Sequence, residues 1–149
     1  MSESKLVAVA REMVEGFNTG DFRRATRHMA ADIVYEEVAT QRTFRGPAEW
    51  EEATRQWKEA MPDLRGNVTK TVVSGDTVVH EITWEGTQSG PLSMQGETVP
   101  ASGQRSSTRA TQVIVFDGDK VKTVRHYFDL LGFMQKIGAV PLHKRAGRG

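Results

Sequence analysis

The order of hydrophobic periodicities along the chain limits the folds that it can adopt. In most of the first sixty residues, apolar side chains recur three and four positions apart, as in amphipathic helices. From residue 67 onward they mostly alternate with polar side chains, as in half-buried strands. In an α+β domain, helices and strands occupy separate parts of the chain. Here the helices come first, and strands connected by tight turns follow. The pattern therefore predicts a curved antiparallel sheet with helices on its concave face, and a ligand pocket between them.

Helical segments are expected near the N-terminus and after a turn at residues 44–47. Ser2 or Ser4 can cap the first helix. Its buried stripe comprises Leu6, Ala10, Met13, Val14 and Phe17. Asp21 can cap a short second helix that runs to Met29. The helix after the turn presents one face formed by Trp50, Ala53, Trp57 and Ala60.

Strands are predicted over residues 32–38, 67–73, 77–88, 106–116 and 120–128. The connection 90–103 is rich in Gly, Pro and Ser with few large apolar anchors, so we expect a pocket rim that is mobile without ligand. A last short helix spans 130–137. No linker or repeat divides the chain, so residues 1–149 are expected to form one domain with frayed ends at 1–5 and 142–149.

Composition argues against several classes of function. The net charge of +1 provides no field to attract nucleic acid or an anionic membrane, and only the tail from His143 is locally basic. Without cysteine the chain has no disulfide or thiolate nucleophile, and the absence of a long apolar segment leads us to expect a cytoplasmic protein. The chain has neither a phosphate-binding glycine loop nor a nucleophile elbow, and its histidines lack the close spacing of metal ligands, so we expect no metal.

Strand alternation predicts which side chains point inward. In the strands 77–88 and 120–128 the expected inward set is Val78, His80, Ile82, Trp84, Val124, His126 and Phe128. Ile33, Tyr35 and Glu37 share one face of the first strand, and Ala110, Gln112 and Ile114 share one face of the strand 106–116. Whether Glu37 and Gln112 point inward stays open. The opposite face carries a mixed apolar patch, formed by Val79, Thr83, Val113, Val115 and Tyr127. A patch of this kind is typical of an interface, so we expect a homodimer.

Short motifs in register resemble the SnoaL-like polyketide cyclase family over nearly the whole chain. They are FRGPAE (44–49), MPDL (61–64), WEGT (84–87), PASG (100–103) and RHYFDLLG (125–132). Limonene epoxide hydrolase and ketosteroid isomerase are similar to this family in fold. The resemblance implies a cone-shaped α+β barrel around one deep apolar pocket, acid–base chemistry without a cofactor, and a homodimer.

His126 is the strongest candidate for chemistry, because an imidazole can exchange a proton near neutral pH. The resemblance places it where related enzymes carry a catalytic Asp on the last strand, so His126 departs from that pattern. The alternative is a structural histidine. Tyr35 and Glu37 resemble the water-holding tyrosine and polar partner of limonene epoxide hydrolase; Glu37 can pair with His126, or end its strand in solvent.

Further candidates complete the predicted site. Tyr35 and Gln112 can donate hydrogen bonds to an enolate oxygen, with a core tyrosine and a surface glutamine as alternatives. Asp129 is either a helix N-cap or a carboxylate at the pocket wall. Residues expected to line the substrate pocket are Phe17, Trp50, Trp57, His80, Ile82, Trp84, Ile114 and Phe128. The Asp and Arg that attack and polarise the epoxide in limonene epoxide hydrolase would fall near Ile82 and Trp84 of this chain. Because this chain lacks both residues there, epoxide hydrolysis by that pair is not expected.

These residues favour a cyclase that acts on a bulky, apolar, polyketide-like substrate by intramolecular aldol addition. His126, with Glu37, would move the proton, and Tyr35 with Gln112 would stabilise the enolate. An isomerase, an epoxide-opening cyclase or a pericyclic cyclase could use the same pocket. A non-catalytic ligand-binding or dimerisation domain is the alternative from another class, and it is favoured if His126 and Glu37 face solvent.

Overall fold

Six strands form one sheet in the order β2-β1-β8-β7-β4-β3 in the computed structural model, which describes residues 2–94 and 96–140. The strands are β1 (Met29–Glu37), β2 (Arg42–Arg45), β3 (Arg65–Ser74), β4 (Thr77–Thr87), β7 (Arg105–Asp117) and β8 (Lys120–Phe128). All neighbouring pairs are antiparallel except β1 and β8, which are parallel. The predicted α+β class is confirmed, but the sheet is curved and open rather than a closed barrel, because β2 and β3 are free edges.

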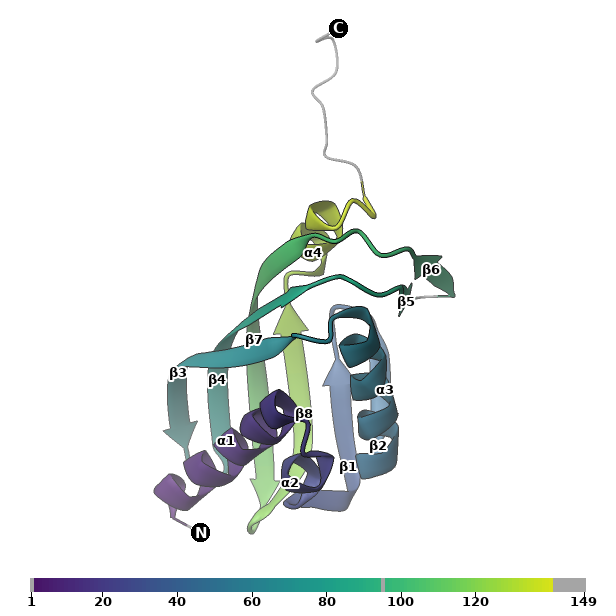
Figure 1. Ribbon diagram of the computed structural model, residues 1–149. Helices are drawn as coiled ribbons and strands as arrows, with labels where there is room; N and C mark the ends of the chain where they lie inside the picture. Colours follow the sequence, from purple (N-terminus) through teal and green to yellow (C-terminus); the bar gives the residue numbers. More distant parts are fainter. Residues whose placement is uncertain (1, 95, 141–149) are drawn as a thin grey trace, which may run out of the picture.

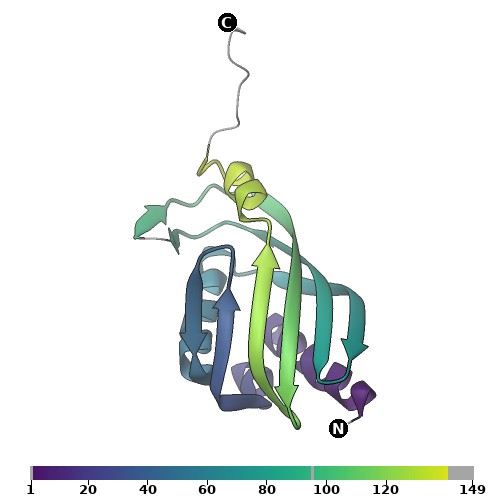
Figure 2. The same cartoon turned by 180° about the vertical axis from the view of Figure 1, so that it is seen from behind.

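Three helices lie on one face of this sheet, namely α1 (Glu3–Thr19), α2 (Phe22–Thr26) and α3 (Gly46–Ala60) (Figure 1). A further helix, α4 (Leu130–Lys136), lies at the end of the sheet beyond β8 (Figure 1). Figure 1 shows α1, α2 and α3 in front of the strands, and Figure 2 shows that helices leave the other face of the sheet uncovered. In the described part of the chain, no helix is both long and apolar enough to cross a membrane.

Local capping fixes where the first helix starts and ends. The Ser2 hydroxyl accepts a hydrogen bond from the Lys5 amide at 3.3 Å, so the helix begins inside the segment 1–5 that we expected to be frayed. The helix ends at Gly20, whose positive φ of 73° suits the left-handed cap. The other end expected to fray, residues 142–149, lies outside the described residues.

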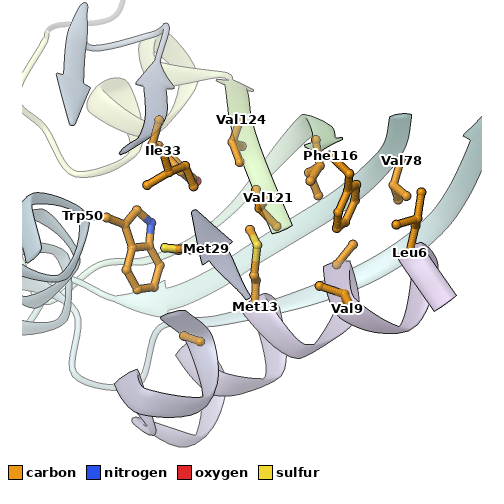
Figure 3. Packing of buried hydrophobic residues seen from close by; sticks show 14 residues of the cluster. Leu6, Val9, Met13, Met29, Ile33, Trp50, Val78, Phe116, Val121 and Val124 are labelled. Atoms are coloured by element: carbon orange, nitrogen blue, oxygen red, sulfur yellow. The ribbon is translucent and has the colours of Figure 1, made fainter. Parts of the chain in front are cut away.

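The main core forms between α1 and the inner face of the sheet. Leu6, Val9 and Met13 project from α1 toward side chains of the strands, among them Val78 and Val121 (Figure 3). Burial in β7 alternates residue by residue along the strand. The predicted inward set is confirmed, since every member is buried or half-buried while Glu81, Arg109 and Arg125 on the other face are exposed. Glu37 and Gln112, whose direction the sequence left open, are buried as well.

Two parts of the fold differ from the prediction. The segment expected as a turn at 44–47 contains the end of strand β2, which pairs with β1. The second helix ends at Thr26 rather than Met29, because Met29 already belongs to β1 and pairs with Val121.

The connection 90–103 is better anchored than its composition indicates. It folds into a small hairpin of β5 (Leu92–Met94) and β6 (Glu97–Val99). Leu92 and Met94 are buried in a second core cluster with residues of α4, including Phe133. The buried amide of Gln88 donates to carbonyls of the connection and accepts from the Ser102 amide. The few apolar side chains of this segment therefore do anchor it, and its mobility without ligand stays a prediction.

Replacing Leu92 tests this anchoring. Leu92→Ala should lower the free energy of unfolding by about 2–5 kcal/mol, because it leaves a cavity in a packed cluster. Ser93→Ala, on the exposed side of the same strand, should leave stability nearly unchanged. Urea unfolding of both variants measures the difference, and equal unfolding midpoints would contradict the packing described here.

Candidate active site

A cavity between the helices and the inner face of the sheet collects most of the predicted site. Its walls are mainly apolar and aromatic, and their polar members are Tyr35, Glu37, Thr54, Ser106, Thr108, Gln112 and His126. The aromatic and other apolar walls include Met13, Phe17, Phe44, Trp50, Trp57, Met61, Leu64, Trp84, Phe128 and Phe133. A few polar groups in an apolar cavity are typical of a small-molecule site.

Most, but not all, of the expected pocket residues line this cavity. Phe17, Trp50, Trp57, Trp84 and Phe128 do so. The prediction was wrong for the three others: His80, Ile82 and Ile114 point inward but are not part of the wall. Helix α1 covers their part of the sheet, where Ile82 packs against Val14 and Ile114 belongs to the main core.

Both nitrogens of the His126 ring are hydrogen-bonded. The Trp84 indole Nε1 donates to Nε2 at 3.2 Å, and Nδ1 lies 3.0 Å from the Tyr35 hydroxyl. Because an indole N–H can only donate, Nε2 must be the acceptor, so the proton of the neutral ring is on Nδ1. His126 therefore donates through Nδ1 to the Tyr35 oxygen.

Burial keeps His126 neutral. It lowers the pKa of His126 to about 4, and the nearby Glu37 charge opposes this shift only in part. Protonation would also place an Nε2 proton against the indole N–H of Trp84, which is a donor facing a donor. At neutral pH the ring is therefore uncharged, and its Nε2 lone pair accepts the Trp84 N–H.

Tyr35 is oriented as a hydrogen-bond donor toward the cavity. Its oxygen accepts from Gln112 Nε2 at 3.1 Å and from the Nδ1 proton of His126, which uses both lone pairs. Its own proton is thus left for another partner. Burial, helped by the Glu37 charge, raises the pKa of Tyr35 far above its ordinary value, so the hydroxyl stays protonated.

Glu37 is buried, but it does not pair with His126 as we expected. Its carboxylate accepts from Arg42 at 2.8 Å, from Thr40, and from the Trp57 indole at 3.1 Å. Strand β2, which the sequence did not reveal, supplies this arginine opposite Glu37. The alternative of a solvent-facing strand end is also wrong, as Glu37 is 5 % exposed. The carboxylate thus anchors Trp57 in the cavity wall.

The non-catalytic alternative was to be favoured if His126 and Glu37 faced solvent. Both residues are buried and line the cavity, so the structure does not meet this condition. Asp129, in contrast, is exposed and its carboxylate accepts from the Gly132 amide at 2.9 Å. The N-cap alternative for Asp129 is confirmed, and the structure places its carboxylate outside the cavity wall.

The sheet register aligns a row of polar side chains across the inner face. In spatial order they are Thr71, His80, Gln112, His126, Glu37 and Arg42. His80 is fully buried and burial lowers its pKa to about 4, so its ring is neutral. Its ring nitrogens and the Gln112 Oε1 have no hydrogen-bond partner within residues 2–94 and 96–140.

Several wall residues were missed by the sequence analysis. Ser106 and Thr108 have the same alternation as Gln112 and could have been found by extending that pattern along the strand. The contact between Trp84 and His126 joins non-neighbouring strands, so local periodicity carries no signal for it. No group of three or more His, Asp or Glu side chains suited to a metal occurs in the described part of the chain.

Comparisons with known proteins agree with this architecture. Residues 7–137 match the family model of the SnoaL-like polyketide cyclases. Among solved structures, a proposed SnoaL-like polyketide cyclase from Jannaschia sp. CCS1 superposes with a TM-score of 0.81 at 24% identity, covering 93% of this chain and 95% of that one. No curated protein sequence matches the chain.

Two Streptomyces structures are similar to the same degree. AclR, a proposed hydroxylase from Streptomyces galilaeus, gives a TM-score of 0.80 at 24% identity, with 97% of this chain and 87% of that one covered. TsrD from Streptomyces laurentii gives 0.80 at 25% identity, with 94% and 99% covered. These similarities establish the shared fold.

Proposed function

Because the chain belongs to the SnoaL-like polyketide cyclase family, we propose that it is an enzyme that closes a ring in a polyketide-like molecule by acid–base chemistry. The observation that carries this proposal is the Tyr35–His126–Gln112 cluster in the wall of an aromatic cavity. The cluster combines a neutral base, His126, with a hydroxyl donor, Tyr35, and the proposed reaction needs no cofactor.

The first step is removal of a proton from carbon. The substrate carbonyl oxygen accepts the Tyr35 proton as a hydrogen bond, and the C–H bond beside that carbonyl breaks as an N–H bond forms at Nε2 of His126. Trp84 must release Nε2 in this step, because its indole occupies the same lone pair. The resulting enolate stays bound to Tyr35, whose raised pKa keeps its own proton in place.

Ring closure then needs no additional reactant. The enolate carbon attacks a second carbonyl of the same molecule, a C–C bond forms, and the new alkoxide takes the proton back from His126. The cavity favours this intramolecular addition by holding the two carbons close together. An isomerase would share the first step and return the proton to another carbon.

The low pKa of His126 restricts the substrate. A base whose conjugate acid has a pKa of about 4 is weak, so it needs a C–H bond that is already acidic. A carbon between two carbonyl groups has this property. We therefore propose an aromatic or otherwise apolar 1,3-dicarbonyl compound as the substrate class.

Deuterium exchange tests the first step without the natural substrate. The protein should accelerate exchange of the protons between the carbonyls of ethyl 2-naphthoylacetate in D2O, measured by proton NMR. His126→Gln should slow the catalysed exchange by about 10²-fold or more, since Gln cannot accept the proton. Tyr35→Phe should lower it by about 10²-fold by removing the donor.

Arg125→Gln is the matched control, because Arg125 is exposed on the outer face of the same strand. This variant should catalyse deuterium exchange of the probe as fast as the wild type does. The catalysed rate should stay level from pH 8 to pH 5 and fall near pH 4, as His126 becomes protonated. Undiminished exchange by His126→Gln would remove His126 from the mechanism.

We also propose that the chain forms a homodimer through the outer face of the sheet. Helices leave this face uncovered (Figure 2), and it carries half-buried Val79, Val113 and Val115 beside exposed Tyr127. Light scattering at micromolar concentration should give the mass of a dimer. Val113→Lys should shift that mass toward the monomer by placing a charge in the interface, whereas a monomer mass for the wild type would contradict the proposal.

A further inference from the structure

Ser106 is a buried polar group of the cavity wall that the proposed reaction does not use. It lies near the start of β7 on the inward face and is 4 % exposed. Its hydroxyl has no hydrogen-bond partner within residues 2–94 and 96–140. A buried hydroxyl without a partner carries an uncompensated desolvation penalty, and a hydrogen-bond partner supplied by a ligand would remove this penalty.

The surroundings of Ser106 are mainly apolar. Its neighbour across the sheet is Gly86, where an added Cβ would lie 2.9 Å from the Met61 Cε, 3.1 Å from the Leu64 Cα and 3.2 Å from the Asp63 Oδ1. That carboxylate oxygen accepts from the Thr87 amide, and Met61 and Leu64, unlike Asp63, line the same cavity as Ser106. Ser106, with Thr108 two residues further along the strand, therefore supplies the polar groups of a mainly apolar end of the cavity wall.

Ser106 is far from the Tyr35–His126–Gln112 cluster along the strand. It precedes Gln112 by an even number of residues, so both point inward, and a rise of about 3.4 Å per residue separates their Cα atoms by roughly 20 Å. Thr108, between them, lines the cavity as well. The cavity wall thus presents hydrogen-bonding groups at two separate places with aromatic side chains between them.

We propose that Ser106 binds an oxygen at the end of the substrate remote from the reacting dicarbonyl, and thereby selects elongated substrates that carry an oxygen at both ends. The inference rests on the proposed function, because it takes the other end of the substrate to lie at Tyr35. A hydroxyl or carbonyl on an apolar, multi-ring molecule satisfies the Ser106 hydroxyl, which can both donate and accept. Ser106 then determines which substrate binds and in which direction, while the chemistry stays with His126.

A pair of probes that differ in one hydroxyl tests the subsite. Ethyl 3-oxo-3-(p-terphenyl-4-yl)propanoate and its 4″-hydroxy derivative carry the same dicarbonyl, and only the second has an oxygen at the far end of the rings. The rod between the ketone carbon and this oxygen is about 14 Å long, so with a hydrogen bond of about 3 Å at each end it matches the separation of the two places. Titration calorimetry should show that the hydroxyl strengthens binding to the wild type by about 3- to 10-fold. Ser106→Ala should abolish this gain and leave the affinity for the unsubstituted probe unchanged.

Ser107→Ala is the matched control, since Ser107 is the exposed neighbour on the opposite face of the same strand. It should keep the full gain. Ser106→Ala should also melt no lower than the wild type, because it removes a hydroxyl that has no partner within the described residues. A lower melting temperature would indicate a structural role and contradict the proposal.

The remaining outcomes separate the subsite from the catalytic proposal. Persistence of the gain in Ser106→Ala, no gain in the wild type, or an equal loss for both probes would overturn the subsite. Failure of the wild type to bind either probe would overturn the subsite together with the substrate class. A gain that depends on Ser106 without any catalysed deuterium exchange would support the subsite and overturn the proposed reaction.

Discussion

The site depends on one buried imidazole whose two nitrogens are both occupied. Strand β4 supplies the indole that donates to His126, β1 supplies the tyrosine that accepts from it, and β7 supplies the amide that holds this tyrosine. The Trp84 ring is itself held by backbone packing, as any Cβ at Gly66 would fall 2.6 Å from it. The chemistry therefore exists only when four strands have paired in the correct register, which couples the site directly to the fold.

Charge is kept close to this imidazole but not in contact with it. The Glu37 carboxylate accepts from Arg42 and from the Trp57 indole, and the Arg42 guanidinium balances its negative charge. Had Glu37 bonded to His126, its charge would have favoured the imidazolium form, as a carboxylate partner does. The arginine from β2 thus helps to keep the ring neutral, and the cavity wall acts through hydrogen bonds rather than through ions.

Much of the site follows from alternation, and its errors have physical causes. A period of two residues fixes which side chains of a strand share a face, so His126 could be placed inward from the sequence, whereas the direction of Gln112 stayed open until the strands on both sides of it were known. The same period does not say which inward positions a helix covers, and for that reason His80 and Ile114 were assigned to the pocket. Strand β2 has only four residues and lies beside a turn. Four residues are too few for an alternating pattern to distinguish a strand from a turn. Without β2, the partner of Glu37 could not be inferred.

The most direct test of this account is the protonation state of His126 in solution. Nitrogen-15 NMR of protein labelled in its histidine rings, with the signal assigned by its loss in His126→Gln, reports both charge and tautomer. The account predicts that at pH 6 the ring is neutral with its proton on Nδ1, and that it becomes charged only near pH 4, because burial and the Trp84 bond oppose protonation. An imidazolium at pH 6, or a neutral ring protonated on Nε2, would contradict it.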